Sequence, residues 1–148
     1  MKLAGLKSVD GAHEESIWAA AWAPATDHRP TAVLLTGELD ETVRAWLPND
    51  LAALGYPARG HALGVVALAA HPAGVLAAAV SLDSYIRVFD VDTGTPVATL
   101  EAPPSEVWGV QFHPKVSAWL VPPLVGTLYF FKKRQKWLLS CDFFCNLG

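Results

Sequence analysis

The chain of 148 residues has little of the material from which metal sites and secreted folds are built. It contains two cysteines, Cys141 and Cys145, and only 17% of its residues are charged. The cysteines lie four apart, and no Cys or His pair follows at zinc-site spacing, so two free thiols are expected. Residues 1–11 hold an apolar stretch too short for a secretory signal. We therefore expect no metal site and no secretion.

The signatures of catalysis are missing as well. The sequence has no Gly-x-Ser-x-Gly elbow, no phosphate loop and no His cluster at metal-ligand spacing. The formal net charge is −3 and no basic stripe is present, which disfavours nucleic-acid binding. We expect no catalytic residue, no cofactor and no direct contact with nucleic acid.

What is present is a repeat. The segment at 34–46, LLTGELDETVRAW, recurs at 78–89 as AAVSLDSYIRVF, and in both copies an Asp precedes an aromatic residue by six positions. The segments that precede these two copies, 12–24 and 60–72, also match each other, and a third copy of them at 102–114 aligns without a gap. The three segments end at Pro24, Pro72 and Pro114. The step between the two aspartates, 40 to 83, is 43 residues. This period is typical of four-stranded propeller blades, which span about 40–45 residues.

Each copy reads as short strands separated by turn residues, which predicts an all-β fold. In the second copy the expected strands are 65–70, 75–81, 86–91 and 96–100. The outer strand of the first copy, at 54–59, is expected to be weak because Pro48, Gly55 and Pro57 interrupt it. The first copy also carries a polar insertion at 26–30 (TDHRP), which we interpret as a surface loop.

These copies resemble the WD-repeat family. Trp46-Leu47 and Phe89-Asp90 stand where the family has its closing Trp-Asp dipeptide. The resemblance implies a hydrogen-bond network of an opening His, a Ser or Thr, the turn Asp and the closing Trp. In the first copy this is the full set His13, Thr36, Asp40 and Trp46. The second copy keeps only His61 and Asp83, because Ala79 and Phe89 lack the hydroxyl and the indole N–H, so its network should be weaker.

Over residues 1 to about 115, longer sequence strings resemble one branch of the WD-repeat family. TGELDETVRAW and LEAPPSEVWG are similar to the plant VERNALIZATION INDEPENDENCE-type branch, the counterpart of the superkiller-complex WD-repeat subunit. This branch implies a non-enzymatic scaffold, nuclear and cytoplasmic, shared by the polymerase-associated-factor transcription-elongation complex and the superkiller messenger-RNA decay complex. In plants it implies roles in histone modification and flowering-time control. Partners are expected to be proteins.

The predicted architecture is a partial WD-repeat β-propeller with an irregular C-terminal tail. A closed ring needs roughly four to eight blades, and this chain supplies two and the start of a third. An inactive or unstable fragment without independent function is therefore the alternative to a scaffold. The expected parts are a strand that closes the ring in longer relatives (1–11), blade one (12–59), blade two (60–101), the start of blade three (102–115) and a divergent tail (116–148).

In this family partners usually dock on the rim where the first strand of each blade starts. Trp18 and Trp108 occupy equivalent positions there and could anchor a partner, since Trp is enriched at binding hot spots; alternatively, they cover the interface between blades. The rim positions predicted by the resemblance are Ser16, Trp18, Leu39, Val66, Leu82, Glu106 and Trp108.

The tail leaves three interpretations open. Residues 116–131 carry no charge but fall short of the 18 or more residues of a membrane helix and contain Pro122-Pro123, so a membrane-tethered fragment is disfavoured. Residues 126–131 (GTLYFF) imitate a blade strand, although no Asp precedes them. An irregular tail is the interpretation we adopt. The basic run 132–136 (KKRQK) fits a nuclear-import patch or a solvated surface.

Overall fold

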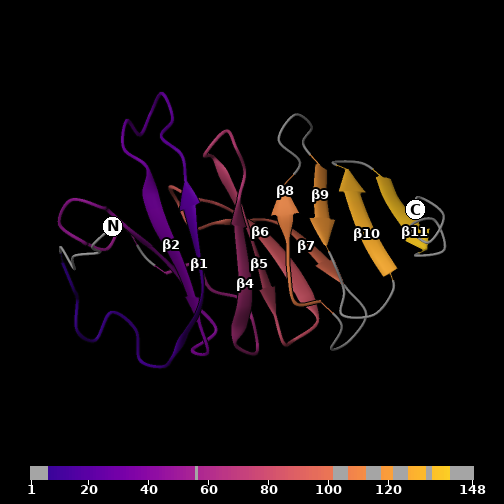
Figure 1. The fold of residues 1–148 in the computed structure, drawn as a ribbon, viewed down its shortest axis with the longest axis horizontal. Coiled ribbons are helices and arrows are strands. Elements are labelled where there is room, and N and C mark those ends of the chain that lie inside the picture. The colour runs from indigo at the N-terminus through magenta and orange to yellow at the C-terminus, as the bar shows by residue number, and fades with distance from the viewer. Residues whose placement is uncertain are drawn as a thin grey trace, which may run out of the picture.

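Every regular element of the described structure is a β-strand. The computed structural model describes residues 7–55, 57–101 and 107–112, together with the backbone of 118–121, 127–132 and 135–140. The strands β1 to β11 group into three antiparallel sheets that follow one another along the chain (Figure 1). The predicted all-β, partial-propeller fold is confirmed. Among these residues, no helix is long and apolar enough to cross a membrane.

The first sheet contains three strands in the order β1 (Ile17–Ala23), β2 (Val33–Glu38) and β3 (Val43–Trp46). Its outer strand is reduced to two isolated bridges, Val43 with Ala58 and Trp46 with Ala53. The weak outer strand expected from Pro48, Gly55 and Pro57 is therefore confirmed. Residues 7–11 form no strand, and residues 1–6 of the predicted ring-closing segment lie outside the described residues.

The second sheet has all four strands, in the order β4 (Val65–Ala70), β5 (Leu76–Ser81), β6 (Tyr85–Asp90) and β7 (Pro96–Glu101). These bounds agree with the predicted strands to within one residue. The tight turn between β5 and β6 places Ser84 at φ 67°, and Glu41 has φ 70° at the matching point between β2 and β3. Both residues directly follow the repeat aspartate, whose side chain holds this turn, as described below.

The third sheet corrects the expectation of an irregular tail. Strand β8 (Gln111–Phe112) pairs with β9 (Ala118–Val121), which continues into β10 (Thr127–Lys132) and β11 (Gln135–Ser140). The degenerate-blade interpretation of 126–131 thus describes the backbone better than the irregular tail. The basic run at 132–136 includes the last residue of β10 and the first two of β11. Its residues 133–134, together with Cys141 and Cys145, lie outside the described residues.

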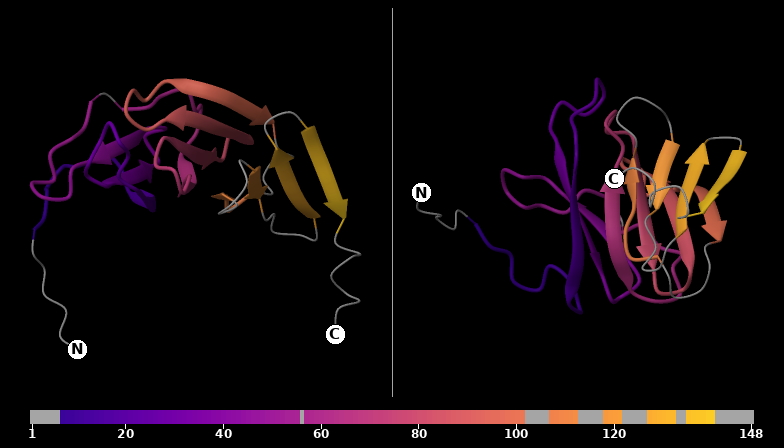
Figure 2. Two further views of the ribbon diagram at one scale, coloured as in Figure 1. Left: turned by 90° about the horizontal axis from the view of Figure 1, so that it is seen from above. Right: turned by 45° about the vertical axis from the view of Figure 1, so that its right-hand side comes forward.

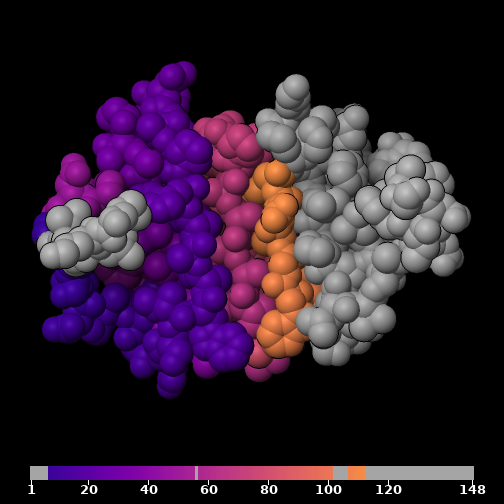
Figure 3. Space-filling model, viewed as in Figure 1, coloured from indigo at the N-terminus to yellow at the C-terminus, as the bar shows by residue number. Residues whose placement is uncertain are grey.

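The three sheets are arranged along an arc (Figure 2). The first strands of the sheets, β1, β4 and β8, are neighbours across one side of the molecule (Figures 1 and 3). In the space-filling view, residues 107–112 form a narrow band beside the second sheet (Figure 3). This is the blade order expected of an open segment of a propeller.

The middle sheet is buried on both faces, and its sequence reflects this. Ala77 and Ala79 of β5 belong to the core shared with the first sheet, while Ala78 and Val80 belong to the core shared with β8 and the residues before it. A strand covered on both sides reads as a continuous apolar run rather than an alternating one. The AAAV run of β5 is therefore explained by its position between two other sheets.

Candidate functional site: the histidine networks and the rim

The first blade contains a buried chain of hydrogen bonds across three segments. Trp46 Nε1 donates to Thr36 Oγ1 at 2.7 Å, and Thr36 Oγ1 lies 2.5 Å from His13 Nε2. Since the hydroxyl accepts from the indole, its own proton is free to point to His13 Nε2, which leaves Nδ1 protonated. His13 Nδ1 then faces Glu38 Oε2 at 3.0 Å. The structure thus joins His13, Thr36 and Trp46, three of the four residues for which the resemblance implies a network.

The carboxylate that contacts His13 is Glu38, where the resemblance had placed Asp40. Glu38 is fully buried and accepts hydrogen bonds from the backbone N–H groups of Glu14 and Glu15, both at 3.1 Å. Burial, aided by hydrogen bonding with Asp40, raises the pKa of Glu38 to about 7, against the opposing effect of the two backbone donors. Burial, and after it the charge of Arg44, lowers the pKa of His13.

Asp40 instead holds the turn between β2 and β3. Its Oδ1 accepts from the backbone N–H of Thr42 at 2.9 Å and from the Thr42 hydroxyl at 2.6 Å, and Arg44 Nη2 lies 3.4 Å from Oδ2. Burial alone would raise the pKa of Asp40, but the hydrogen bonds from Glu38 and Thr42 and the charge of Arg44 outweigh it and lower this pKa. Asp40 is therefore linked to the histidine network through Glu38.

In the second blade one residue, the turn aspartate Asp83, both holds the turn and contacts the histidine. Asp83 accepts from the backbone N–H of Tyr85 at 2.9 Å, which holds the turn, and from that of Ala62 at 2.8 Å. It also lies 3.2 Å from His61 Nδ1 and accepts from Arg87 Nη1 at 2.8 Å. Although burial acts to raise it, the pKa of Asp83 is lowered by these backbone donors and by Arg87. Ser81, which occupies the position of Glu38, bonds the carbonyl of Leu63 instead.

The missing hydroxyl in blade two leaves a buried nitrogen without a partner. His61 Nδ1 lies 2.6 Å from Arg87 Nη1 and 3.2 Å from Asp83 Oδ2, so this nitrogen already has partners. His61 Nε2 is buried and has no hydrogen-bond partner in the described structure, because Ala79 stands where blade one has Thr36. Burial lowers the pKa of His61, and Asp83 partly offsets this.

One group of side chains has the composition of a metal site. Ligand atoms of His13, Glu38 and Asp40 all lie within 4.8 Å of one another. Most of their lone pairs already accept hydrogen bonds: Glu38 from two backbone N–H groups, Asp40 from Thr42. Arg44 supplies positive charge beside Asp40. The group is therefore already neutralised by the protein, and we interpret it as structural.

The rim positions differ in exposure. Trp18 is 53% exposed, Trp108 is 46% exposed and Leu82 is 40% exposed, and Ser16 is exposed as well. Leu39 and Val66 are half-buried, and Leu39 packs over Gly64, where a Cβ would come within 2.5 Å of its side chain. Glu106 lies outside the described residues. Trp18 sits at the β-bulge between Ile17 and Ala19, a device that re-aims a side chain.

Arg29 is a connection between blades that sequence reasoning missed. It lies in the insertion 26–30, interpreted above as a surface loop, yet its side chain is buried and reaches the second blade. It donates to the carbonyls of Pro24 at 2.7 Å and Gly74 at 2.9 Å, and to Asp92 Oδ1 at 2.5 Å. The insertion has no counterpart in the other copies, so the repeat alignment gave no signal for this role.

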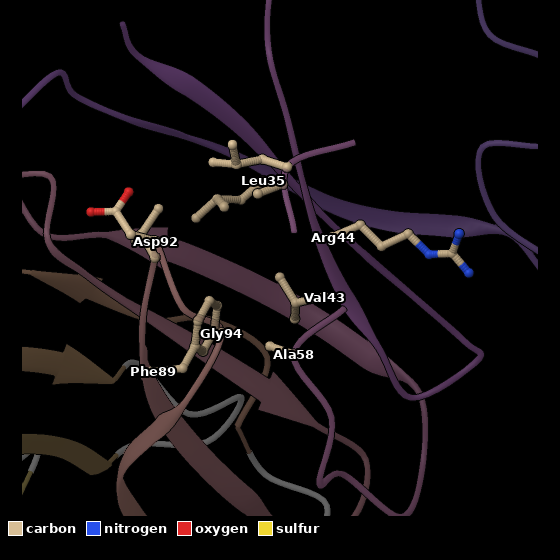
Figure 4. Close-up of a pocket in the computed structure, with 10 residues that line it drawn as sticks. Leu35, Val43, Arg44, Ala58, Phe89, Asp92 and Gly94 are labelled. Atoms are coloured by element: carbon tan, nitrogen blue, oxygen red, sulfur yellow. The ribbon is translucent and has the colours of Figure 1, made fainter. Parts of the chain in front are cut away.

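A small hollow opens between the first two blades (Figure 4). Leu35 and Val43 of the first blade and Phe89 of the second line it, while the guanidinium of Arg44 and the carboxylate of Asp92 point outward on opposite sides. The lining residues are mostly apolar and present no converging polar groups, which a ligand site requires. We interpret the hollow as part of the blade interface.

Comparisons with known proteins agree with this blade geometry. The family described as WD domain, G-beta repeat matches residues 56–90, which include β4, β5 and β6. Residues 56–90 therefore carry a WD repeat. It is 64% identical over 115 residues to the WD repeat-containing protein VIP3 of Arabidopsis thaliana, an alignment covering 78% of this chain and 35% of that protein.

A second relative is more distant. The WD repeat-containing protein SL1-17 of Schistosoma mansoni is 36% identical over 104 residues, covering 70% of this chain and 34% of that protein. The chain thus spans about a third of the length of both relatives. Proteins built from WD repeats generally act as non-catalytic scaffolds for other proteins.

Proposed function

We propose that the chain is a non-enzymatic protein-binding scaffold, a subunit of transcription-elongation and messenger-RNA decay assemblies in the nucleus and cytoplasm. The exposure of Trp18 and Trp108 carries this proposal. Each is the seventh residue of its repeat, counted from 12 and from 102. Both present about half of a large aromatic side chain to solvent. Such side chains supply most of the binding energy where they enter a pocket of a partner.

The surroundings of Trp18 favour a partner with basic and apolar groups. Glu14, Glu15 and Ser16 precede it and are exposed, and Glu41 in the neighbouring turn is exposed too. Leu82 adds an exposed apolar side chain at the corresponding turn of the second blade. Carboxylates at the edge of an aromatic anchor steer a positively charged partner and fix its orientation.

The test is capture of purified subunits of the polymerase-associated-factor and superkiller complexes by Trp18→Ala, Trp108→Ala and the double variant. A hot-spot residue costs about 2 kcal/mol or more, which is roughly 30-fold in Kd. Val97→Ala is the matched control, because Val97 is 56% exposed on the outer strand β7. Unchanged capture by the folded double variant would refute the rim. Failure of the folded wild-type chain to bind any of these subunits would favour a fragment without independent function.

A further inference from the structure

Glu38 is a buried acid that holds the segment leading into β1. It is the last residue of β2, and its side chain is fully buried. Its two carboxyl oxygens accept hydrogen bonds from the backbone N–H groups of Glu14 and Glu15, each at 3.1 Å. Both of these residues belong to the segment 12–16, which forms no strand. One carboxyl group thus ties an irregular segment to the edge of the first sheet.

The position of Trp18 depends on this segment. Trp18 lies in the β-bulge that begins at Ile17, and Ile17 is paired with Glu38 itself. Opening of residues 12–16 would free the N-terminal side of Trp18 while the rest of β1 stays paired with β2. The rim position of this tryptophan is therefore only as firm as the hold of Glu38 on the segment.

The charge of Glu38 determines whether its burial is favourable. The ionisable groups that face it are His13, whose Nδ1 lies 3.0 Å from Oε2, and Asp40, which itself bonds Arg44. Burial, and after it the hydrogen bond with Asp40, raises the pKa of Glu38 to about 7, although the two backbone donors act against this. Burial also lowers the pKa of His13, so this histidine supplies no positive charge near pH 7. Above that pH, two carboxylates lie side by side.

We propose that Glu38 is a positioning residue for the rim: with its proton bound it holds residues 12–16 and Trp18 for partner binding, and loss of the proton opens the segment. The segment opens before the sheet does, because it forms no strand and Glu38 ends β2, so few hydrogen bonds break when water reaches the carboxylate. The consequence for partner binding rests on the function proposed above.

Proton linkage gives the direction of the effect. In the opened segment Glu38 meets water and its pKa returns towards 4.5, so the open form binds the proton less tightly than the held form. The held form therefore has its full advantage below pH 4.5 and loses it as the pH rises through 7.

The second blade supplies an internal control. Its turn acid Asp83 accepts the backbone N–H of Ala62 at 2.8 Å, as Glu38 accepts those of its segment. Although burial acts to raise it, the pKa of Asp83 is lowered by its backbone donors and by Arg87. Asp83 therefore stays ionised over the range in which Glu38 loses its proton, and the Ala62 amide should not respond.

Amide hydrogen exchange of the folded wild-type chain, followed by NMR from about pH 5.5 to about pH 8, tests the positioning role. The protection factors of the Glu14 and Glu15 amides, which are corrected for the intrinsic exchange rate, should fall about ten-fold or more, and that of Ala62 should stay constant. The indole N–H signal of Trp18 should change with the same midpoint. Constant protection of the two amides, or a Trp18 signal that does not follow their loss of protection, would overturn the proposal.

Glu38→Gln assigns the effect to this carboxyl group, because the pH dependence of the two amides should disappear in the folded variant. If circular dichroism shows that Glu38→Gln is unfolded, the carbon-13 chemical shift of the Glu38 carboxyl in the wild-type chain replaces it. The midpoint of that shift must then coincide with the loss of protection, and a different midpoint would overturn the proposal.

Partner capture at both pH values separates this proposal from the function on which it rests. Subunits captured by the wild-type chain should bind about ten-fold more weakly at the higher pH. Glu38→Gln should show no such difference, which controls for titration of the subunits themselves. Wild-type binding that is equal at both pH values, although the segment opens, would overturn the proposal. Absence of capture at both pH values would contradict the scaffold function, whereas hydrogen exchange would still decide whether Glu38 positions the segment.

Discussion

Arg29→Met removes the buried link between the first two blades while keeping much of the side-chain volume. Arg29 is 8% exposed, and its guanidinium bonds the carbonyls of Pro24 and Gly74 as well as Asp92. The contact is close, since a Cβ at Gly74 would lie 2.3 Å from the Pro24 oxygen. A hydrogen bond from a charged donor contributes about 1.5–3 kcal/mol, and removing one partner of a buried set leaves the others unsatisfied.

We expect Arg29→Met to lower the free energy of unfolding by about 3 kcal/mol, since the carbonyl bonds dominate. The Asp92 side chain is 39% exposed, so Asp92→Asn should cost less than about 1 kcal/mol. Urea unfolding followed by circular dichroism measures both. Arg59→Met is the control at an exposed arginine and should stay within about 0.5 kcal/mol of wild type. The reasoning fails if Arg29→Met costs no more than Arg59→Met, or no more than Asp92→Asn.

Two further substitutions test the histidine networks. The pKa of Glu38 is about 7 in the folded chain against 4.5 for the free side chain, so its contribution to stability is fully present below pH 4.5 and is lost as the pH rises through 7. The stability of Glu38→Gln relative to wild type should therefore rise over this range by up to about 3 kcal/mol, measured by urea unfolding at several pH values, and a flat difference would contradict the raised pKa. Ala79→Ser should give the orphaned Nε2 of His61 a partner and add about 1 kcal/mol, whereas Ala77→Ser, buried on the same face, should destabilise. Equal losses for the two serine variants in urea unfolding would show that Nε2 does not bond the new hydroxyl.

The strands of the second blade were predictable because local signals mark each of their ends. Asp83 closes one turn and holds it through the Tyr85 N–H, and the proline and glycine of the preceding turn mark another. The third sheet carries no such Asp before β10, so its strands resembled an apolar tail. Propensity and spacing could place the strands of the second blade. The strands of the third sheet are identified only by their pairing, β10 with β9 and β9 with β8.

Glu38 and Arg29 escaped prediction for a different reason. Their roles depend on segments far away in sequence: Glu38 on the N–H groups of Glu14 and Glu15, and Arg29 on Gly74 and Asp92. A faint signal existed for Glu38, since it is an acidic residue in an apolar strand at the position of Ser81. The repeat alignment did not indicate a role for Glu38, because an alignment assumes that residues at equivalent positions have the same role.

The bulge in β1 separates two groups of side chains on that strand. Without it, residues 18, 20 and 22 would share one face of the strand. The register shift between Ile17 and Ala19 instead groups Ile17 with Ala20 and Trp22, and takes Trp18 out of that face. The same shift occurs between Val65 and Ala67, where Val65 packs on the first blade. A single extra residue at the strand start therefore lets a blade stack on its neighbour through one set of side chains and keep another at the rim for binding.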